Sequence, residues 1–145
     1  MLRPPSKNHG TAAKEFVDFF RKVRGPRFTF NEDRLHAIGK RVHQRGFHLG
    51  GAKRHLSAIA ATGDRTPHLK EVDVPFLVIH GTHDPLVPVW GGYATHRALR
   101  RAKLKLIHGL GHELPLGVWP LLVSAIHRHA RAHGFEVGDA SQIAG

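Results

Sequence analysis

Two short apolar runs separated by one helical segment constrain the fold of this 145-residue chain more than any other feature. The first run, VPFLVIH at residues 74–80, is continuous and ends at Gly81; the second, KLKLIHG, covers residues 103–109. Continuous apolar runs of this length are typical of strands buried on both faces of a parallel sheet. We therefore expect two parallel strands, connected by a helix over roughly residues 90–101.

A last helix is expected from about residue 116 to residue 133, where apolar residues recur at helical spacing. Its expected inner face consists of Val118, Trp119, Leu122 and Ile126. Strand, helix, strand and helix in succession indicate an α/β fold. Two strands do not complete a sheet, so their free edges are expected to promote self-association.

The N-terminal part of the chain is expected to form three short helices with basic outer surfaces. Their apolar faces are Phe16, Phe19, Phe20 and Val23; Leu35, Ile38 and Val42; and Leu56 and Ile59. Thr11 and Asn31 are placed as N-caps, and Gly25 and Gly63 as helix stops. Three narrow apolar faces bury little surface, so these helices are not expected to form a domain alone.

The net charge of +11 is unevenly distributed along the chain. Residues 1–70 hold 15 of the 22 Lys and Arg residues but only 5 of the 11 Asp and Glu residues. A basic surface suits nucleic acids, but the sequence shows no zinc finger, glycine-rich phosphate loop or aromatic RNA-binding strand. Nucleic acid is therefore not the expected partner, although a non-enzymatic basic module that binds nucleic acid or protein stays open as the alternative function.

Several classes of protein and site are not expected from the composition. No apolar stretch approaches the ~20 residues of a membrane span, and the start, MLRPPSKNHG, lacks the apolar core of a signal peptide, so a cytoplasmic location is expected. Without cysteine there are no disulfides and no thiolate sites. His80 and His83 lie near Asp84, and His129 and His133 are one helical turn apart, but no further carboxylate lies nearby. We expect no metal and no cofactor.

A carboxylate and an imidazole follow the two expected strands. Asp84 lies in HGTHDPLVP, and His112 lies in GLGHELP. Side chains beyond the carboxyl ends of parallel strands gather at one edge of a sheet. An aspartate that accepts a hydrogen bond from Nδ1 leaves Nε2 free to take a proton from a nucleophile. Separately, Asp84 suits a turn, and His112 suits a surface position or a core position with its hydrogen bonds satisfied; together they favour an acid–base pair.

Both motifs resemble the C-terminal part of the α/β-hydrolase fold family, in which the chain order is nucleophile, acid and histidine. The resemblance covers about residues 71–133 and assigns Asp84 as the acid and His112 as the histidine. It implies a helical cap-like segment at 1–70, a partial hydrolase core of two strands with flanking helices at 71–134, and a loose tail at 135–145. The implied activity is hydrolysis of a small ester, lactone or amide through an acyl-enzyme.

The sequence departs from that family at the nucleophile. The family's serine lies in a Gly-x-Ser-x-Gly motif, whereas the serines here, at positions 6, 57, 124 and 141, all lie outside such a motif. We therefore expect no nucleophile in this chain and little or no activity from it alone. Trp90 is a candidate for lining a substrate pocket, whereas Trp119 is expected in the core. For the three phenylalanines of the first helix, core packing is favoured over a cap surface facing substrate.

Overall fold

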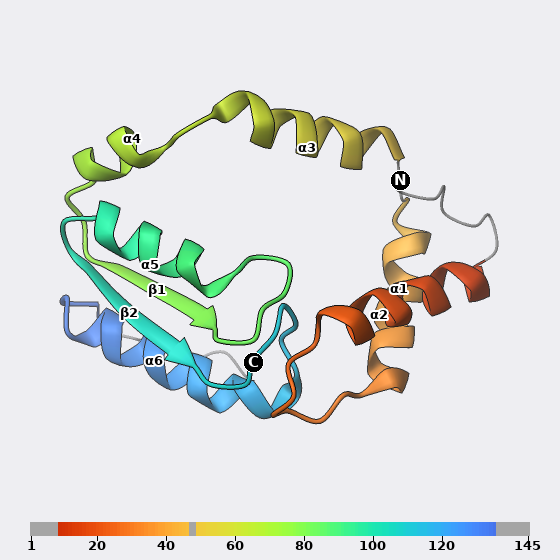
Figure 1. Cartoon of the computed structure of the whole chain (residues 1–145). Coiled ribbons are helices and arrows are strands. Elements are labelled where there is room, and N and C mark those ends of the chain that lie inside the picture. The colour runs from red at the N-terminus through yellow and green to blue at the C-terminus, as the bar shows by residue number, and fades with distance from the viewer. Residues whose placement is uncertain (1–8, 47–48, 136–145) are drawn as a thin grey trace.

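A computed structural model of the chain describes residues 9–46 and 49–135 (Figure 1). The tail predicted at 135–145 lies outside these residues, except for Phe135. The helices are α1 (His9–Val23), α2 (Glu32–Gln44), α3 (Leu49–Thr62), α4 (Thr66–Glu71), α5 (Val89–Ala98) and α6 (Trp119–Arg131), with a 3₁₀ helix, η1 (Leu116–Val118), before α6. No described helix is long and apolar enough to cross a membrane.

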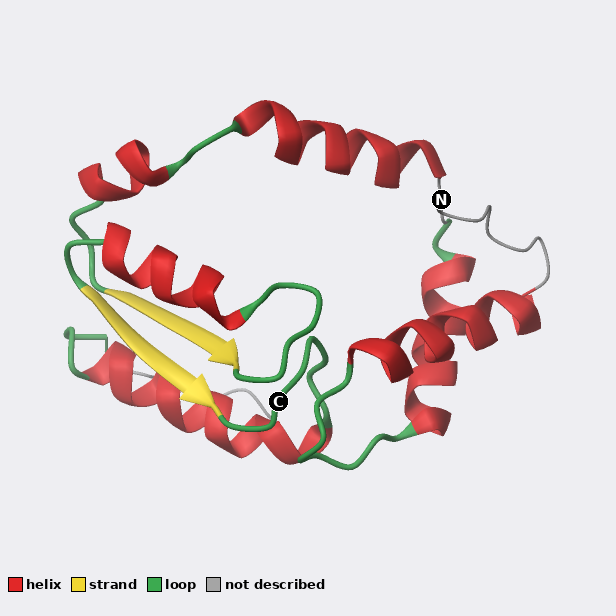
Figure 2. Ribbon diagram, in the orientation of Figure 1, coloured by secondary structure: helices red, strands yellow, loops and turns green. Residues whose placement is uncertain are grey.

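The two strands, β1 (Phe76–Gly81) and β2 (Ala102–Ile107), pair in parallel as predicted. Phe76 lies opposite Ala102, and Gly81 lies opposite Ile107, so both strands end at the same edge. Helix α5 connects the strands and packs against them, while α6 runs along the opposite side of the sheet (Figure 2). This arrangement confirms the predicted α/β class, with two parallel strands and flanking helices.

The core of this layered part forms where β2 leads into the following loop and η1. Its buried residues are Ile107, Leu110 and Val118, and the partly buried Phe28, Ile79 and Leu122 pack against them. The expectation that β1 is buried on both faces was wrong, because Phe76 is exposed and the middle of the strand is only partly buried. One helix on each side leaves the strands partly exposed, because the outer edge of each strand has no described neighbour.

Helices α1 and α2 pack against each other and cross at a steep angle beside the strand ends, and this pair is called the helical hairpin below (Figure 1). Asn31 caps α2 as predicted, since its Oδ1 accepts a hydrogen bond from the backbone N–H of Arg34 at 2.8 Å. Thr11 lies inside α1 and is not its N-cap, because the helix already includes His9. Helix α2 covers the face of α1 that contains Val17, so Phe19, predicted on the buried face, is exposed.

Helix α3 ends before Gly63 as predicted, and the φ of +62° at this glycine explains the stop. The predicted inward orientation of Leu56 and Ile59 was wrong, since both are more than half exposed. Figure 1 shows why: α3 forms an arch between the helical hairpin and α4, away from the sheet. An apolar helix face identifies a surface suited to burial, but a partner must be present to bury it.

The last helix differs from its prediction in a similar way. Val118 is fully buried and Leu122 packs on the core, as expected, but Ile126 is exposed and Trp119 is about half-exposed. The indole N–H of Trp119 donates to the carbonyl oxygen of Leu114 at 3.3 Å, which places this ring at the surface of the loop and not in the core. Helix α4 was not predicted.

Candidate active site

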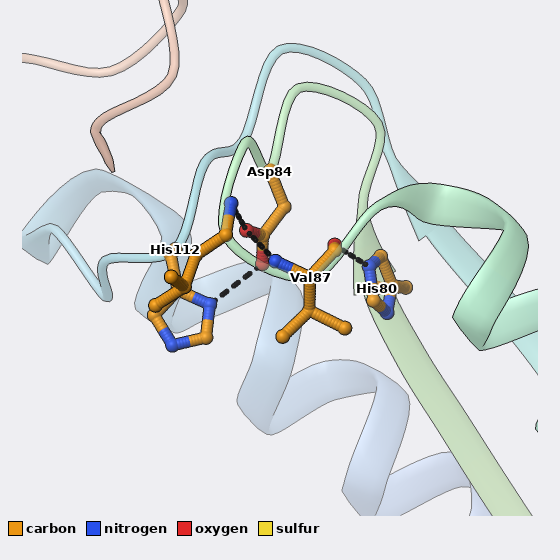
Figure 3. A network of polar contacts seen from close by, with 5 residues as sticks. His80, Asp84, Val87 and His112 are labelled. Atoms are coloured by element: carbon orange, nitrogen blue, oxygen red, sulfur yellow. Dashed lines mark hydrogen bonds and ion pairs between the residues drawn. The ribbon is translucent and has the colours of Figure 1, made fainter. Parts of the chain in front are cut away.

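Asp84 lies in the loop that follows β1, where two backbone N–H groups fix one of its oxygens (Figure 3). Its Oδ1 accepts hydrogen bonds from Leu86 and Val87, both at 2.9 Å. The Nε2 of His80 lies 2.9 Å from the carbonyl oxygen of Val87, and a carbonyl only accepts, so His80 donates this bond. The end of β1 therefore holds the loop that carries the carboxylate.

The loop after β2 carries His112 and is held on two sides. On the β1 side, the backbone N–H of His83 donates to the carbonyl oxygen of Leu110 at 2.9 Å. On the hairpin side, the backbone N–H of His112 donates to the carbonyl oxygen of Val23, the last residue of α1, at 2.8 Å. Gly109 has a φ of +71°, a conformation that favours glycine and turns the chain sharply after the strand.

The segment after α1 packs directly on this loop, backbone against backbone. A Cβ atom added to Gly25 would lie 2.4 Å from the backbone nitrogen of Gly111, closer than real Cβ contacts allow. The backbone N–H of Arg27 also donates to the carbonyl oxygen of Gly109 at 3.2 Å. The sequence indicated Gly25 as a helix stop and Gly111 as a loop residue, but it gave no signal that the two meet.

The structure brings Asp84 and His112 together as predicted. The second carboxylate oxygen, Oδ2, lies 2.7 Å from Nδ1 of His112 (Figure 3). The carboxylate side chain is 7% exposed, whereas the imidazole is 38% exposed. Both sequence interpretations of Asp84 therefore apply, because one oxygen closes a turn and the other bonds the imidazole. With Nδ1–H as the donor, Nε2 is the ring nitrogen left for other chemistry.

The hydrogen bonds favour the ionised form of the Asp84 carboxyl. Burial by itself would raise its pKa, but the bonds from Val87, His112 and Leu86 together hold the pKa below its usual value. An ionised acceptor favours the His112 tautomer that carries its proton on Nδ1 and stabilises a positive charge that develops on the ring. The pair is thus arranged to accept a proton at Nε2.

Two cavities border His112. The hairpin cavity, of about 310 Å³, lies between the helical hairpin and the loop from His112 to Leu116. Its apolar hairpin wall is formed by Phe16, Phe20, Leu35 and Ile38. The sheet cavity, of about 560 Å³, includes Asp84, His112 and apolar residues of β1 and α6. The imidazole therefore stands between an apolar space under the hairpin and a larger space at the strand ends.

Glu113 lines both cavities and was missed by the sequence analysis. It is 5% exposed, and its Oε1 has no hydrogen-bond partner within the described residues. Burial raises the pKa of Glu113, and the charge of Arg24 opposes this shift. The sequence places Glu113 directly after His112, but a glutamate in a loop gives no signal that it is buried.

Trp90, the predicted pocket residue, lies in the first turn of α5 and is 69% exposed. It is not among the residues that line the two cavities beside His112. Phe16 and Phe20, for which core packing was favoured, do line the hairpin cavity. Across residues 9–46 and 49–135, the His, Asp and Glu side chains form no group of three suited to a metal ion.

Comparisons with known proteins agree with the sequence resemblance. The α/β-hydrolase family described as TAP-like protein matches residues 56–118. A non-heme chloroperoxidase of Burkholderia pyrrocinia is 31% identical over 135 residues, which cover 77% of this chain and 46% of that protein. A non-heme chloroperoxidase of Streptomyces lividans is 44% identical over 44% of this chain and 24% of its own length.

A third relative, the bifunctional esterase/perhydrolase DCH of Acinetobacter calcoaceticus, is 36% identical over 46% of this chain and 25% of its own length. The chain thus spans less than half the length of these relatives. The parallel strand–helix–strand arrangement is consistent with this sequence similarity. This chain belongs to the α/β-hydrolase family.

Proposed function

We propose that this chain carries the acid and the histidine of a hydrolase active site that acts on a small ester, lactone or amide. The observation that supports this most strongly is the 2.7 Å contact between Asp84 and His112 at the carboxyl ends of two parallel strands. The buried acid, the more exposed imidazole and the adjoining cavities all suit acyl transfer. An esterase among the relatives favours an ester over an amide as substrate.

In this proposal His112 is the general base and then the general acid. Its Nε2 removes the proton from a nucleophilic hydroxyl as that oxygen attacks the substrate carbonyl carbon. The same nitrogen then gives the proton to the departing alcohol or amine. The acyl-enzyme that remains is hydrolysed by water. Asp84 keeps the imidazole in the required tautomer and stabilises the imidazolium between these steps.

The nucleophile, we infer, comes from residues other than these 145. Ser57 and Ser124 are the serines in the described part of the chain, and neither lines a cavity beside His112. Ser124 instead accepts a hydrogen bond from Arg128 on the same helix. Ser6 and Ser141 lie outside the described residues and outside any Gly-x-Ser-x-Gly motif. The chain alone is therefore proposed to be inactive.

The first test measures hydrolysis of p-nitrophenyl acetate and butyrate by the wild-type chain and by His112→Ala. We expect no turnover above the buffer rate from either protein. Turnover by the wild type that disappears in His112→Ala would overturn the inference that the nucleophile lies elsewhere. Turnover that persists equally in His112→Ala would contradict the role of this histidine.

A chimera tests the role of the pair directly. Residues 1–145 would replace the matched 46% of the Burkholderia pyrrocinia relative, so that the remainder of that protein supplies the other groups. We expect this chimera to hydrolyse p-nitrophenyl butyrate, and Asp84→Asn to lower kcat by roughly 10³–10⁴-fold. The conservative exchange keeps the shape of the side chain. A folded, active chimera unaffected by Asp84→Asn and by His112→Ala would refute the proposal.

A further inference from the structure

Glu113, which lines the hairpin cavity, has a buried carboxyl oxygen without a partner among the residues that the structure describes. Oε1 of Glu113 is buried without a hydrogen bond within the described residues, and this residue follows the proposed base directly. A buried polar group without a partner destabilises the folded state, and native proteins rarely leave one unpaired without cause. A ligand group that bonds this carboxyl would remove the cost.

Two other polar side chains of this cavity, Asn31 and Arg34, already have interactions. Oδ1 of Asn31 is occupied by the backbone N–H of Arg34, as the cap of α2. The guanidinium of Arg34 lies over the ring of Trp119, 5.6 Å from its centroid. Against the apolar wall that the hairpin provides, Glu113 is thus a group whose hydrogen-bonding capacity is still unused.

We propose that Glu113 determines substrate specificity, by binding a hydroxyl group on the portion of the substrate that occupies the hairpin cavity. This inference rests on the proposed hydrolase function and adds the class of substrate: a small ester whose apolar chain carries a hydroxyl. The volume of about 310 Å³ suits a chain of this kind.

The charges around the cavity favour a hydroxyl over an ammonium group. Arg34 lines the cavity and Arg24 lies close enough to affect the Glu113 carboxyl, so a cationic ligand would face two guanidinium groups. Burial raises the pKa of the Glu113 carboxyl, and the neutral form of a carboxyl both donates and accepts a hydrogen bond. A hydroxyl group has the same two capacities and brings no charge into an apolar space.

The test measures binding, so that its outcome is independent of whether the chain hydrolyses anything. Two ketones that copy a short ester but resist hydrolysis, 2-octanone and 8-hydroxy-2-octanone, would be titrated into the ¹⁵N-labelled full chain and followed by NMR. Glu113→Met removes the polar atoms at similar length, and Glu113→Gln keeps a donor and an acceptor as the matched control.

We expect the amide signals of Leu35, Ile38 and His112 to shift on titration. The measured quantity is the affinity for the hydroxyketone relative to that for 2-octanone. It should fall about tenfold in Glu113→Met, which corresponds to the loss of one hydrogen bond, and it should change little in Glu113→Gln. Equal relative affinities in wild type and Glu113→Met would overturn the proposal, as would the absence of shifts at this cavity. Loss of turnover in the chimera with intact hydroxyl selection would instead count against the hydrolase proposal alone.

Discussion

The backbones of Gly25 and Gly111 meet so closely that neither residue has room for a side chain. A Cβ atom at Gly111 would lie 2.3 Å from the backbone nitrogen of Gly25 and 2.4 Å from the carbonyl oxygen of Val23. The obstructing atoms belong to the backbone, so they cannot move aside as a flexible side chain would. This contact fixes the loop of His112 against the end of α1.

The first prediction follows from this contact. Gly111→Ala should lower the free energy of unfolding by about 1–3 kcal/mol, because the added methyl group forces the two segments apart. Urea denaturation would measure the loss, and the amide signal of His112 would report the displaced loop. Gly91→Ala is the matched control, since its Cβ would meet only a side-chain atom at 3.6 Å. An equal effect of both substitutions would contradict the prediction.

A second prediction concerns stability in acid. The folded pKa of Asp84 lies below its usual value of 3.8, so its contribution to stability is present above that pH and is lost as the pH falls through the folded pKa. Asp84→Asn should therefore flatten the decline in unfolding free energy below about pH 4. Denaturation series in this acid range would show it. Parallel pH curves for the variant and the wild type would argue that the carboxylate interactions contribute nothing.

The third prediction concerns Glu113, whose contribution to stability changes with pH in the opposite direction to that of Asp84. The folded pKa of Glu113 lies above its usual value of 4.5, so its neutral form favours folding below that pH, and the contribution is lost as the pH rises through the folded pKa. The variant Glu113→Gln, which never ionises, should gain stability relative to the wild type between pH 4.5 and pH 7. Urea midpoints at these two pH values test this. A stability difference that does not grow with pH would contradict it.

A fourth prediction compares two valines near the start of the last helix. Val118 is fully buried beside Ile107 and Leu110, whereas Val123 is exposed. Val118→Ala should cost about 1–3 kcal/mol of unfolding free energy through lost apolar contact and a cavity, and Val123→Ala less than about 0.5 kcal/mol. Thermal and urea denaturation measure both. Similar losses of unfolding free energy in the two variants would contradict the prediction that this core stabilises the fold.

The fifth prediction concerns association. Each strand of the two-stranded sheet has one edge without a described neighbour, and backbone groups on such edges pair readily with another chain. The isolated chain should therefore sediment as a concentration-dependent mixture, and its melting temperature should rise with protein concentration. A monomer at every concentration, with an unchanged melting temperature, would contradict this.

The sequence predicted the parts of the molecule that depend on local patterns. Apolar runs located β1 and β2 to within about two residues, and the loop motifs identified Asp84 and His112. The cap at Asn31 and the stop at Gly63 were also predictable, since both depend on neighbouring residues. Strand ends in a parallel pair are adjacent, so even the meeting of two distant residues followed from the βαβ pattern.

What the sequence did not predict depends on contacts between distant segments. Periodicity identified the apolar face of α3, but Leu56 is exposed because no described element covers it. The burial of Glu113 arises only when the loop of His112 packs near the helical hairpin. The meeting of Gly25 and Gly111 likewise has no local signature, because each glycine already had a sufficient local explanation.

The hydrogen bond from His112 to Val23 gives the hairpin a mechanical role. A lid that swings over a site ordinarily leaves the reacting groups in place as it moves. Here the end of α1 holds the backbone of the histidine itself, so a swing of the hairpin would pull the imidazole away from Asp84. Any displacement of the hairpin would therefore also disturb the pairing that prepares His112 for proton transfer.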